Sequence, residues 1–432
     1  MAYIHRTNGT ATNELIWTFS CWVKKSDPEL GAMFGFAAAA TNTPEFSITS
    51  NDYLQFWTSG ASIHLATDAL YQGPAAWYTQ GTPADRVNIY VNGTQITDFS
   101  TETYPGSSYN SEVNKSGEVL EIGKTGGTGL NGVMSHVHFV DGTQYTASTF
   151  GETDATSGIW KIKTSPSVTY GTNGFFLKME DRTNLDLDSG TNAFTFTTSG
   201  TLTATYDNPS NNFCTMNPIN NYYAGMTLSN GNTTLVTGSG IYAPLQATLG
   251  MAGGKWYWEM KCIASPTNNE YLPGIASTQT TSSGAYLGDT ANDYSMRSAN
   301  GQYYTNASGT AYGSSYDDGD IISIALDLTN SKLYFAINGT WQDSGDPTSG
   351  ATGTGAISIT AVGSTAFGAY VPAFTYWDSG TGTVNYNFGN GYFGTTAVAS
   401  TNADDAGIGS FEYDVPAGFY TLCTKNIKAY GG

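Results

Sequence analysis

The sequence has few charged residues, and most of those are acidic. Only 12% of the 432 residues are Asp, Glu, Lys or Arg, and 16 basic residues against 35 acidic ones give a net charge of -19. Such a charge repels phosphate backbones and anionic membrane surfaces, and no local basic patch counters it. We therefore expect neither nucleic acid nor lipid headgroups as partners.

Long apolar runs and cysteines are also scarce. No run approaches the ~20 apolar residues of a membrane-spanning helix, and the first residues lack the apolar segment of a signal peptide. We expect no membrane insertion and no export by the general route. The four cysteines are far apart and show no C-x-x-C spacing. They are Cys21, Cys214, Cys262 and Cys423. We expect buried thiols in a reducing cytoplasm rather than a disulfide framework or a metal site.

Glycine and aromatic residues are abundant instead, with 52 Gly, 29 Tyr and 20 Phe. Together with Thr, Asn and Ser, these residues favour strands and tight turns over helices. The composition therefore predicts an all-β protein, and the length allows two or three domains with a core in each.

The clearest strand pattern lies between residues 319 and 341. Apolar residues alternate with small or polar ones from 322 to 328 and again from 333 to 337, which is the period of a strand with one buried face. Residues 329–331 supply a turn, and Asn338-Gly339 suits the two positive-φ positions of a type I′ turn. The pattern predicts two hairpins in series around a half-buried strand.

Residues 254–341 resemble a SPRY domain in three motifs. These are a Gly-Lys-x-Tyr-Trp-Glu strand at 254–259, a Gly-Asp-x-Ile-Gly-x-Ala-Leu-Asp strand at 319–327 with Ser323 in place of its second glycine, and a Leu-x-Phe-x-x-Asn-Gly hairpin at 333–339. The resemblance implies a bent β-sandwich that binds through loops at one end and is not an enzyme.

The N-terminal half shows a second set of strand patterns. We expect strands at 13–25, 45–48, 53–57, 86–91, 119–122 and 133–140. A Phe-Ser-x-Trp-Val strand at 19–23 and an Ile-Tyr-Val-Asn-Gly hairpin at 89–93 resemble those of laminin-G-like, concanavalin A-like jelly rolls. The strand that such relatives carry after Trp77-Tyr78 is deleted or shortened here, and the sheet edge it leaves could pair with another subunit.

The hairpin at 86–94 matches the one at 332–340 in its basic first residue, its alternation and its Asn-Gly turn. We therefore expect an all-β chain of two concanavalin A-like/SPRY-like antiparallel β-sandwiches (jelly rolls) in tandem. The expected divisions are a laminin-G-like jelly roll at 1–206, a linker at 207–222, a SPRY-like sandwich at 223–395 and an extended, docked C-terminal segment at 396–432. Further strands are expected at 356–362, 369–374 and 383–388.

Three more segments, 150–154, 166–177 and 388–395, resemble virion structural proteins of marine bacteriophages, and this likeness covers nearly the whole chain. It implies a tail-fibre or other tail or head appendage, assembled in the host cytoplasm and located on the virion. The implied partners are other virion proteins and a host-surface glycan or protein, and the way phage fibres are built implies a homo-oligomer such as a trimer. A capsid decoration or connector protein is the alternative.

Motifs of catalytic sites are missing from the sequence. Glycan hydrolases on concanavalin-like sandwiches aim the carboxylates of Glu-x-Asp-x-x-Glu into one cleft. The nearest approach here is Glu412-Tyr-Asp414, with Ala417 at the third position, so a glycan depolymerase is only a third hypothesis. His136 and His138 could share a strand face, but two ligands do not make a zinc site. We expect no enzyme.

Candidate binding residues flank the SPRY motifs. A sugar offers an apolar face and hydroxyls, which suit exposed aromatic rings beside polar loop residues. The candidates are Tyr303, Tyr304, Tyr312, Tyr316, Tyr376, Trp377 and Asp378. The same aromatic residues could instead cap the sandwich or form a subunit interface.

Two clusters of carboxylates could hold calcium, although Asp and Gly also simply form turns. The clusters are Asp317, Asp318 and Asp320, and Asp186 and Asp188. No other cofactor is expected.

Overall fold

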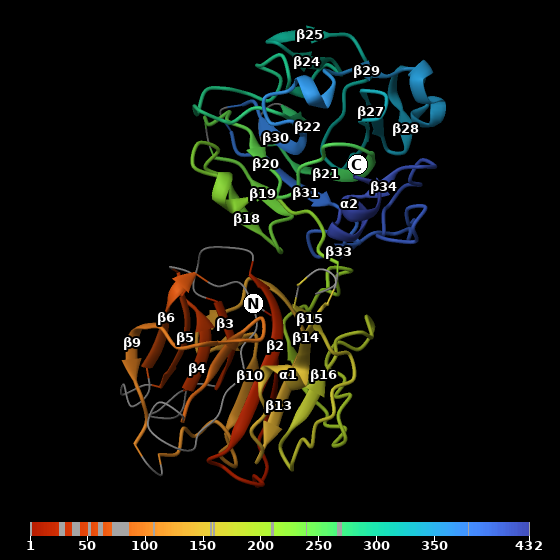
Figure 1. Cartoon of the computed structure of the whole chain (residues 1–432). Coiled ribbons are helices and arrows are strands. Elements are labelled where there is room, and N and C mark those ends of the chain that lie inside the picture. Colours follow the sequence, from red (N-terminus) through yellow and green to blue (C-terminus); the bar gives the residue numbers. More distant parts are fainter. Residues whose placement is uncertain are drawn as a thin grey trace. The chain divides into compact units, whose positions relative to one another are not determined.

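The computed structural model describes residues 2–25, 31–36, 44–50, 53–58, 64–70, 86–106, 109–155, 158, 160–208, 211–238, 240–265, 270–378 and 380–431. The chain forms two compact units, Met1–Ala204 and Thr205–Gly432 (Figure 1). The strand expected to be shortened after Trp77-Tyr78 lies outside the described residues.

The first unit is a sandwich of antiparallel sheets. Its elements are β1 (Tyr3–Thr7), β2 (Trp17–Lys25), β3 (Gly31–Phe36), β4 (Pro44–Ile48), β5 (Tyr53–Thr58), β6 (His64–Leu70), β7 (Ile89–Val91), β8 (Thr94–Ile96), β9 (Phe99–Thr103), β10 (Val119–Ile122), β11 (Lys124–Thr125), β12 (Thr128–Gly129), β13 (Gly132–Asp141), α1 (Ala147–Phe150), β14 (Gly151–Thr153), β15 (Trp160–Ile162), β16 (Phe175–Leu177) and β17 (Thr197–Ser199). The larger sheet has the order β17-β1-β10-β3-β4-β5-β6-β9, and the smaller one has the order β16-β13-β2.

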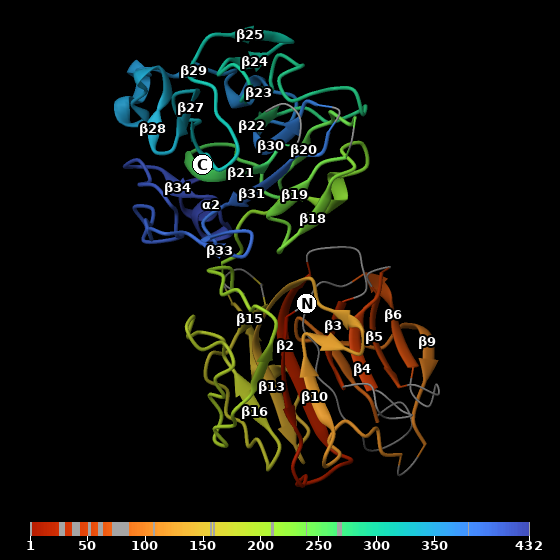
Figure 2. The same cartoon turned by 180° about the vertical axis from the view of Figure 1, so that it is seen from behind.

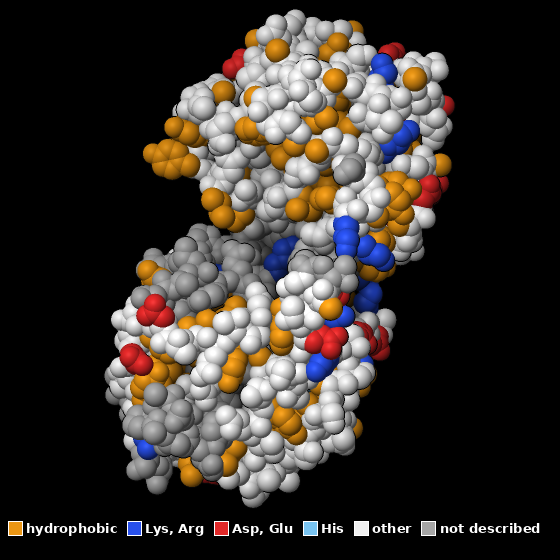
Figure 3. All heavy atoms as spheres, viewed as in Figure 1, with side chains coloured by type: hydrophobic (Ala, Val, Ile, Leu, Met, Phe, Trp, Pro, Cys, Tyr) orange, Lys and Arg blue, Asp and Glu red, His pale blue; other side chains and the backbone are white. Residues whose placement is uncertain are grey.

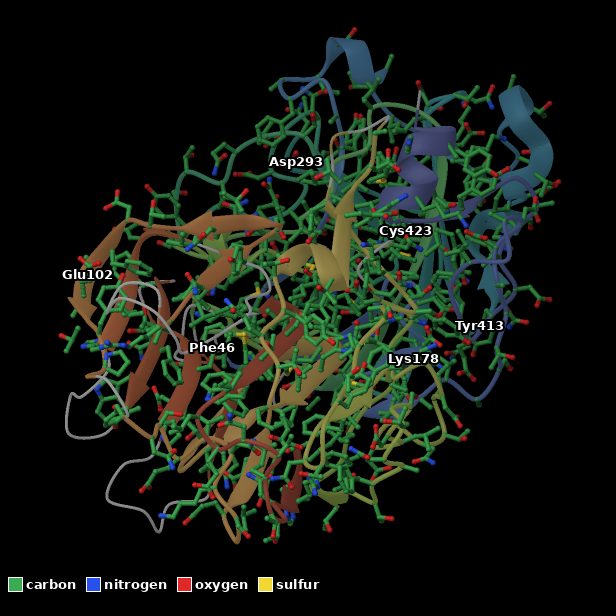
Figure 4. The ribbon with its side chains drawn as sticks, turned by 60° about the horizontal axis from the view of Figure 1, so that its bottom comes forward. Phe46, Glu102, Lys178, Asp293, Tyr413 and Cys423 are labelled. Atoms are coloured by element: carbon green, nitrogen blue, oxygen red, sulfur yellow. The ribbon has the colours of Figure 1, made fainter. Side chains whose placement is uncertain are left out.

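Aromatic side chains from both sheets fill the core of the first unit. Phe19 of β2 stacks on Phe34 of β3 with 4.8 Å between ring centroids. Phe46 of β4, labelled in Figure 4, meets Phe19 edge-on at 5.9 Å. Because side chains alternate along each strand, one face of each sheet supplies these rings. Stacked and edge-on rings are the favoured arrangements for aromatic pairs.

One buried carboxylate joins three segments of the first unit. Asp141, at the end of β13, is 1% exposed. Its oxygens accept hydrogen bonds from the N–H groups of Thr12 (2.7 Å), Asn13 (3.0 Å) and Asn173 (3.0 Å). The side chains of Asn114 and Thr172 donate two more, at 2.6 and 2.9 Å. The Asp141 side chain therefore holds together three segments that are far apart in the sequence, around residues 12–13, 114 and 172–173.

The second unit is also a sandwich. Its elements are β18 (Thr227–Ser229), β19 (Thr234–Val236), β20 (Leu245–Gln246), β21 (Lys255–Ala264), β22 (Tyr271–Ala276), β23 (Tyr294–Met296), β24 (Tyr303–Thr305), β25 (Ser308–Thr310), β26 (Ile321–Asp327), β27 (Lys332–Ile337), β28 (Thr340–Trp341), β29 (Ile357–Ser358), β30 (Val371–Tyr376), β31 (Thr383–Asn387), β32 (Tyr392–Phe393), β33 (Thr396–Ala397), β34 (Tyr420–Thr421) and α2 (Thr424–Tyr430). The predicted fold class, an all-β chain of antiparallel sandwiches, is confirmed.

Two sheets face each other across the core of the second unit (Figure 2). The first has the order β18-β19-β31-β21-β26-β27-β28, with β29 paired to β27 and β34 paired in parallel to β21. The second has the order β20-β30-β22-β23-β24-β25. The strand expected at 356–362 is limited to β29, and a 3-10 turn follows at Val362–Ser364.

The two predicted hairpins are present. β26 pairs with β27 from Ile322↔Ile337 to Asp327↔Lys332. The turn after β27 places Asn338 at φ 48° and Gly339 at φ 78°, the left-handed conformations that a type I′ turn requires. The matching turn of the first unit, after β7, has Asn92 at φ 48° and Gly93 at φ 82°. Both Asn-Gly pairs therefore do what their sequence predicts.

The prediction that β26 is half-buried is wrong, because all seven of its residues are buried. The C-terminal segment covers the face that was expected to meet solvent. Phe411 and Phe419 pack there against Tyr257 and Tyr334, and Phe411 meets Tyr257 edge-on at 5.0 Å. This face of the sheet is therefore part of the interior.

Two expected boundaries differ from the structure. The linker expected at 207–222 contributes Cys214 and Met216 to the main core, and the Cys214 N–H donates to the Leu422 carbonyl at 3.0 Å. The segment expected to be extended from 396 ends in helix α2. Both segments belong to the second unit.

All four cysteines are buried and none forms a disulfide. The structure also brings His138 against Phe176, 3.9 Å apart, with its Nδ1 2.9 Å from the Tyr170 hydroxyl. Packing accounts for this histidine. No helix among the described residues is both long and apolar enough to cross a membrane.

Glu259, the last residue of the Gly-Lys-x-Tyr-Trp-Glu motif, holds the C-terminal segment on the sheet. It is fully buried. Its oxygens accept hydrogen bonds from the N–H groups of Glu412 (3.0 Å) and Tyr413 (2.9 Å), the latter labelled in Figure 4. The Tyr257 hydroxyl and the Asn387 amide donate the other two, at 3.0 and 3.2 Å. The motif glutamate thus binds two backbone donors of a distant segment.

Burial raises the pKa of Glu259 to about 7, and the hydrogen bonds it accepts lower the pKa by less. The folded protein therefore holds this proton more tightly than the unfolded chain, where the carboxyl has its ordinary pKa. The free energy of unfolding should fall as pH rises from about 4.5 to about 7, by up to roughly 3 kcal/mol. Urea denaturation at pH 5, 6, 7 and 8 measures this. The difference in free energy of unfolding between wild type and Glu259→Gln should become smaller as pH rises. If the two free energies changed with pH in parallel, Glu259 would not be the group responsible.

Candidate functional site

Four side chains gather on the outer face of the sheet that contains β30, β22 and β23. Met296 and Tyr376 point into the core. Because side chains alternate, the next residues, Arg297 and Trp377, point to the opposite face. Tyr304 of β24 and Tyr286 of the loop before β23 join them. We call Tyr286, Arg297, Tyr304 and Trp377 the Trp377 cluster.

The loop between β22 and β23 lies on this outer face and positions Tyr286. The N–H of the next residue, Leu287, donates to the Thr375 hydroxyl at 3.1 Å, and the Ser295 hydroxyl donates to the Leu287 carbonyl at 2.6 Å. Asp293, labelled in Figure 4, closes the loop by accepting from the Ser277 N–H at 2.9 Å. The loop is therefore anchored to the sheet at both ends and beside Tyr286.

The aromatic rings of the Trp377 cluster touch one another in favoured geometries. Tyr286 and Trp377 are parallel, with 4.4 Å between centroids and 9° between planes. Tyr304 meets both rings edge-on, at 6.3 Å from Tyr286 and 6.0 Å from Trp377. Offset-stacked and edge-on pairs are the arrangements that aromatic rings favour. The three rings therefore form one connected surface.

Arg297 is held between the rings and a carboxylate. Its guanidinium carbon lies 4.7 Å from the Trp377 ring centroid. Two of its nitrogens donate to the two oxygens of Glu270, and a third donates to the Tyr304 hydroxyl at 3.2 Å. Hydrogen bonding to Glu270 raises the pKa of Arg297 further above its ordinary value, so the cluster pairs a permanent cation with a carboxylate.

The cluster reaches the surface through its edges. Tyr286, Arg297 and Trp377 are partly exposed, and Tyr304 is 9% exposed. No member is a nucleophile beside a base, and the arginine charge is paired. The arrangement is suited to contact a partner through rings and a guanidinium edge.

The structure brings together two of the seven predicted binding residues, Tyr304 and Trp377. Tyr316 and Tyr376 do not reach the surface, since they are 3% and 0% exposed in the core. Tyr303 meets Tyr312 edge-on at 6.1 Å, and both pack against the same core. Tyr303 and Tyr376 miss the cluster because side chains alternate along a strand. Each occupies an inward position next to an outward one. Asp378 is half-buried after Trp377.

The sequence reasoning missed Tyr286, Arg297 and Glu270. Arg297 is one of only four arginines in the chain, and an arginine directly after a strand is a signal that could have been weighed. Tyr286 stands alone in a Gly/Ser/Thr-rich loop, and nothing in the sequence shows that this loop lies across the sheet. Glu270 follows residues outside the described part of the chain.

The calcium candidates accept hydrogen bonds from the chain itself, several of them from distant residues. Asp318 accepts from the Tyr271 hydroxyl at 2.6 Å and the Ser265 N–H at 3.0 Å. Asp188 accepts from the N–H groups of Phe176 (2.9 Å) and Phe194 (2.9 Å). Asp320, Asp317 and Asp186 likewise accept hydrogen bonds from Asn338, Asp318 and Thr198. No group of three or more metal-binding side chains is placed to hold an ion within the described part of the chain.

The carboxylates nearest to a hydrolase pattern do not share a strand face. Glu412 and Asp414 lie outside the strands. One oxygen of Glu412 accepts from the Ala399 N–H at 2.7 Å. The strand alternation that would aim both carboxylates into one cleft is therefore missing at this pair.

Comparison with known proteins agrees with the motifs of the second unit. Residues 255–365 match the model of the SPRY domain family. The second unit contains a SPRY domain. SPRY domains mediate protein–protein interaction. None of the curated proteins matches the chain.

Solved structures of SPRY domains are similar to part of the chain. The SPRY domain of human HERC1 has 20% identity and a TM-score of 0.30, and the match covers 37% of this chain and 91% of that one. A second human SPRY domain has 14% identity and a TM-score of 0.27, and the match covers 37% of this chain and 93% of that one. The stonustoxin structure has 19% identity and a TM-score of 0.30 over 40% of this chain and 27% of its own.

Proposed function

We propose that this protein is a non-enzymatic binding protein of a bacteriophage virion, which attaches the particle to its host through the SPRY domain. The Trp377 cluster carries the proposal, because its aromatic rings and its arginine are already assembled on the outer face of the sheet that contains β30, β22 and β23. The resemblance of segments 150–154, 166–177 and 388–395 to phage virion proteins supports the setting. In this proposal the first unit is a laminin-G-like jelly roll, and the protein is a homo-oligomeric tail or head appendage bound to other virion proteins.

The chemistry of the Trp377 cluster favours a protein partner on the host surface. Trp, Tyr and Arg are the residue types that dominate the energetics of protein interfaces. Here they are already in contact with one another, so binding costs little side-chain entropy. The charge of Arg297 is paired with Glu270, which avoids an unpaired charge in a desolvated interface.

Substituting Trp377 by alanine should weaken binding of the chain to host cells about tenfold or more, since it removes the ring on which Tyr286 and Arg297 rest. Flow cytometry with the fluorescently labelled chain measures this. Phe367→Ala is the matched control, because Phe367 is 43% exposed and precedes β30 at the end opposite to Trp377. Equal binding by wild type and Trp377→Ala would contradict the role of the cluster.

Immunogold electron microscopy of intact virions tests whether the protein is part of the virion and where on the particle it lies. Gold at the tail or at the tips of appendages is the expected result. Gold spread evenly over the head would instead favour a capsid decoration protein, and particles without gold would refute a virion role.

A further inference from the structure

A second surface of the SPRY unit is built from uncharged sequence. Residues 208–254 and residues 271–288 contain no Asp, Glu, Lys, Arg or His. The loops that precede β18, that surround β20 and that follow β22 come from these two stretches. Within a chain of net charge -19, such a neutral surface is unusual, and it carries the most exposed large apolar side chains among the described residues.

Side-chain amides tie the three loops together. The Asn220 amide donates to the Gln246 carbonyl oxygen at 2.6 Å, and the Gln246 amide donates to the Thr278 carbonyl at 2.6 Å. The Gln279 amide reaches the Asn220 side-chain oxygen at 3.3 Å. The Tyr242 N–H adds a backbone bond to the third loop, at 3.1 Å from the Ser283 carbonyl. The loops therefore form one rigid base.

Two tyrosines and an isoleucine project from this base. Tyr222 is 88% exposed, Ile219 is 85% exposed and Tyr223 is 38% exposed. The rings of Tyr222 and Tyr223 are 4.9 Å apart and nearly perpendicular, at 86°. Asn217 caps the short turn that presents Ile219, by accepting from its N–H at 3.0 Å. The edge of one ring therefore meets the face of the other, and Tyr222 presents most of its surface to solvent. We call this pair the Tyr222–Tyr223 corner.

We propose that the Tyr222–Tyr223 corner binds an uncharged oligosaccharide. A hexose presents an apolar face to an aromatic ring and hydroxyls to neighbouring amides and phenols, and this corner offers both kinds of partner. The absence of charged side chains from both stretches gives an acidic sugar no cation to pair with, and the net charge of the chain repels it. The rigid base lowers the ordering cost of binding.

The corner is distinct from the Trp377 cluster in residues and in chemistry. The Trp377 cluster contains an arginine paired with a carboxylate, whereas the corner is neutral throughout. The inference therefore goes beyond the proposed function and can hold or fail independently of it. A single corner binds weakly, and several copies on one particle would multiply the affinity.

The test uses the full chain and six-sugar probes of defined charge. Maltohexaose, cellohexaose and laminarihexaose are the neutral probes, and a hyaluronan hexasaccharide is the acidic one. Saturation-transfer-difference NMR and calorimetry should show binding of at least one neutral probe and none of hyaluronan. Tyr222→Ala should lower the affinity about tenfold, the loss expected for an exposed stacking ring. Tyr222→Phe keeps the ring and removes the phenol, so it should lower the affinity by less. Trp377→Ala should leave it within about twofold.

Any of four outcomes would overturn the proposal. The first is that none of the neutral probes binds, and the second is that hyaluronan binds as well as they do. The third is that Tyr222→Ala binds the neutral probes like wild type. The fourth is that Tyr222→Ala converts an oligomer into a monomer in sedimentation, which would identify the corner as a contact between copies of the chain. Because Tyr222 is almost fully exposed, its substitution should not alter the circular dichroism spectrum.

Discussion

Replacing Glu259 by alanine is expected to destabilise the second unit by about 3–5 kcal/mol. Four donors, two of them backbone N–H groups, lose their acceptor in a region closed to water. Each buried donor left without a partner costs about 1–3 kcal/mol. Part of this loss is offset because the carboxylate itself is costly to bury, as its raised pKa shows. The balance remains strongly unfavourable because the cavity cannot supply new acceptors.

Hydrogen exchange followed by mass spectrometry gives the local measurement for Glu259→Ala. Peptides covering residues 399–422 should lose protection before the strands of the core do, since Glu412 and Tyr413 are released first. Asp414→Ala is the matched control, because Asp414 lies in the same segment and is exposed. Unchanged protection in Glu259→Ala would show that Phe411 and Phe419 hold the segment alone.

Replacing Asp141 by asparagine should destabilise the first unit by about 3–4 kcal/mol. The substitution keeps the size of the side chain but turns one acceptor oxygen into an N–H₂ group, which then faces the N–H donors of Thr12, Asn13 or Asn173. Burial alone would raise the pKa of Asp141, but the donated hydrogen bonds outweigh burial and lower it. The carboxylate form is therefore the one the fold requires.

The same exchange experiment tests Asp141→Asn. Peptides from residues 9–13 and 170–177 should exchange faster, while peptides from the second unit should not change. Asp181→Ala serves as the control, because Asp181 is exposed and its side chain accepts hydrogen bonds from Thr183, two residues further on. Normal protection around Asn173 in Asp141→Asn would refute the role given to this carboxylate.

The sequence predicted the strands whose alternation is set by their own residues. β10 has the expected bounds, 119–122, and β13 differs from the expected 133–140 by one residue at each end. The Asn-Gly turns were equally predictable, because positive φ at two successive positions suits few other pairs. Strand alternation and turn type depend on residues that are adjacent in the sequence, so the sequence alone is enough to predict them.

The features that sequence missed depend on segments far apart in the chain. The burial of both faces of β26 follows from Phe411 and Phe419, more than 80 residues later. The Trp377 cluster exists because the loop carrying Tyr286 lies across the sheet beside Trp377. Two of the seven candidates, Tyr304 and Trp377, belong to this cluster. Period-2 alternation divides neighbours such as Tyr303 and Tyr304 between core and surface.

The surface carries few charged side chains, as expected from a sequence with only 12% charged residues. Figure 3 shows few blue or red side chains on the viewed face. The sequence alone did not show that the neutral stretches 208–254 and 271–288 meet in one set of loops. Their proximity depends on side-chain amides such as those of Asn220 and Gln246, whose partners lie in other loops.

The docking of the C-terminal segment also sets the order of events during translation. β21 emerges from the ribosome long before β34, which pairs with it in parallel. Glu259 of β21 therefore lacks two of its hydrogen-bond donors, the N–H groups of Glu412 and Tyr413, until those residues have been made. The first unit contains all of its sheet partners by residue 199 and can fold while the rest is synthesised. The second unit cannot close until residue 421 has been made, so a nascent chain stalled earlier leaves Tyr257 and Tyr334 uncovered and open to chaperones and proteases.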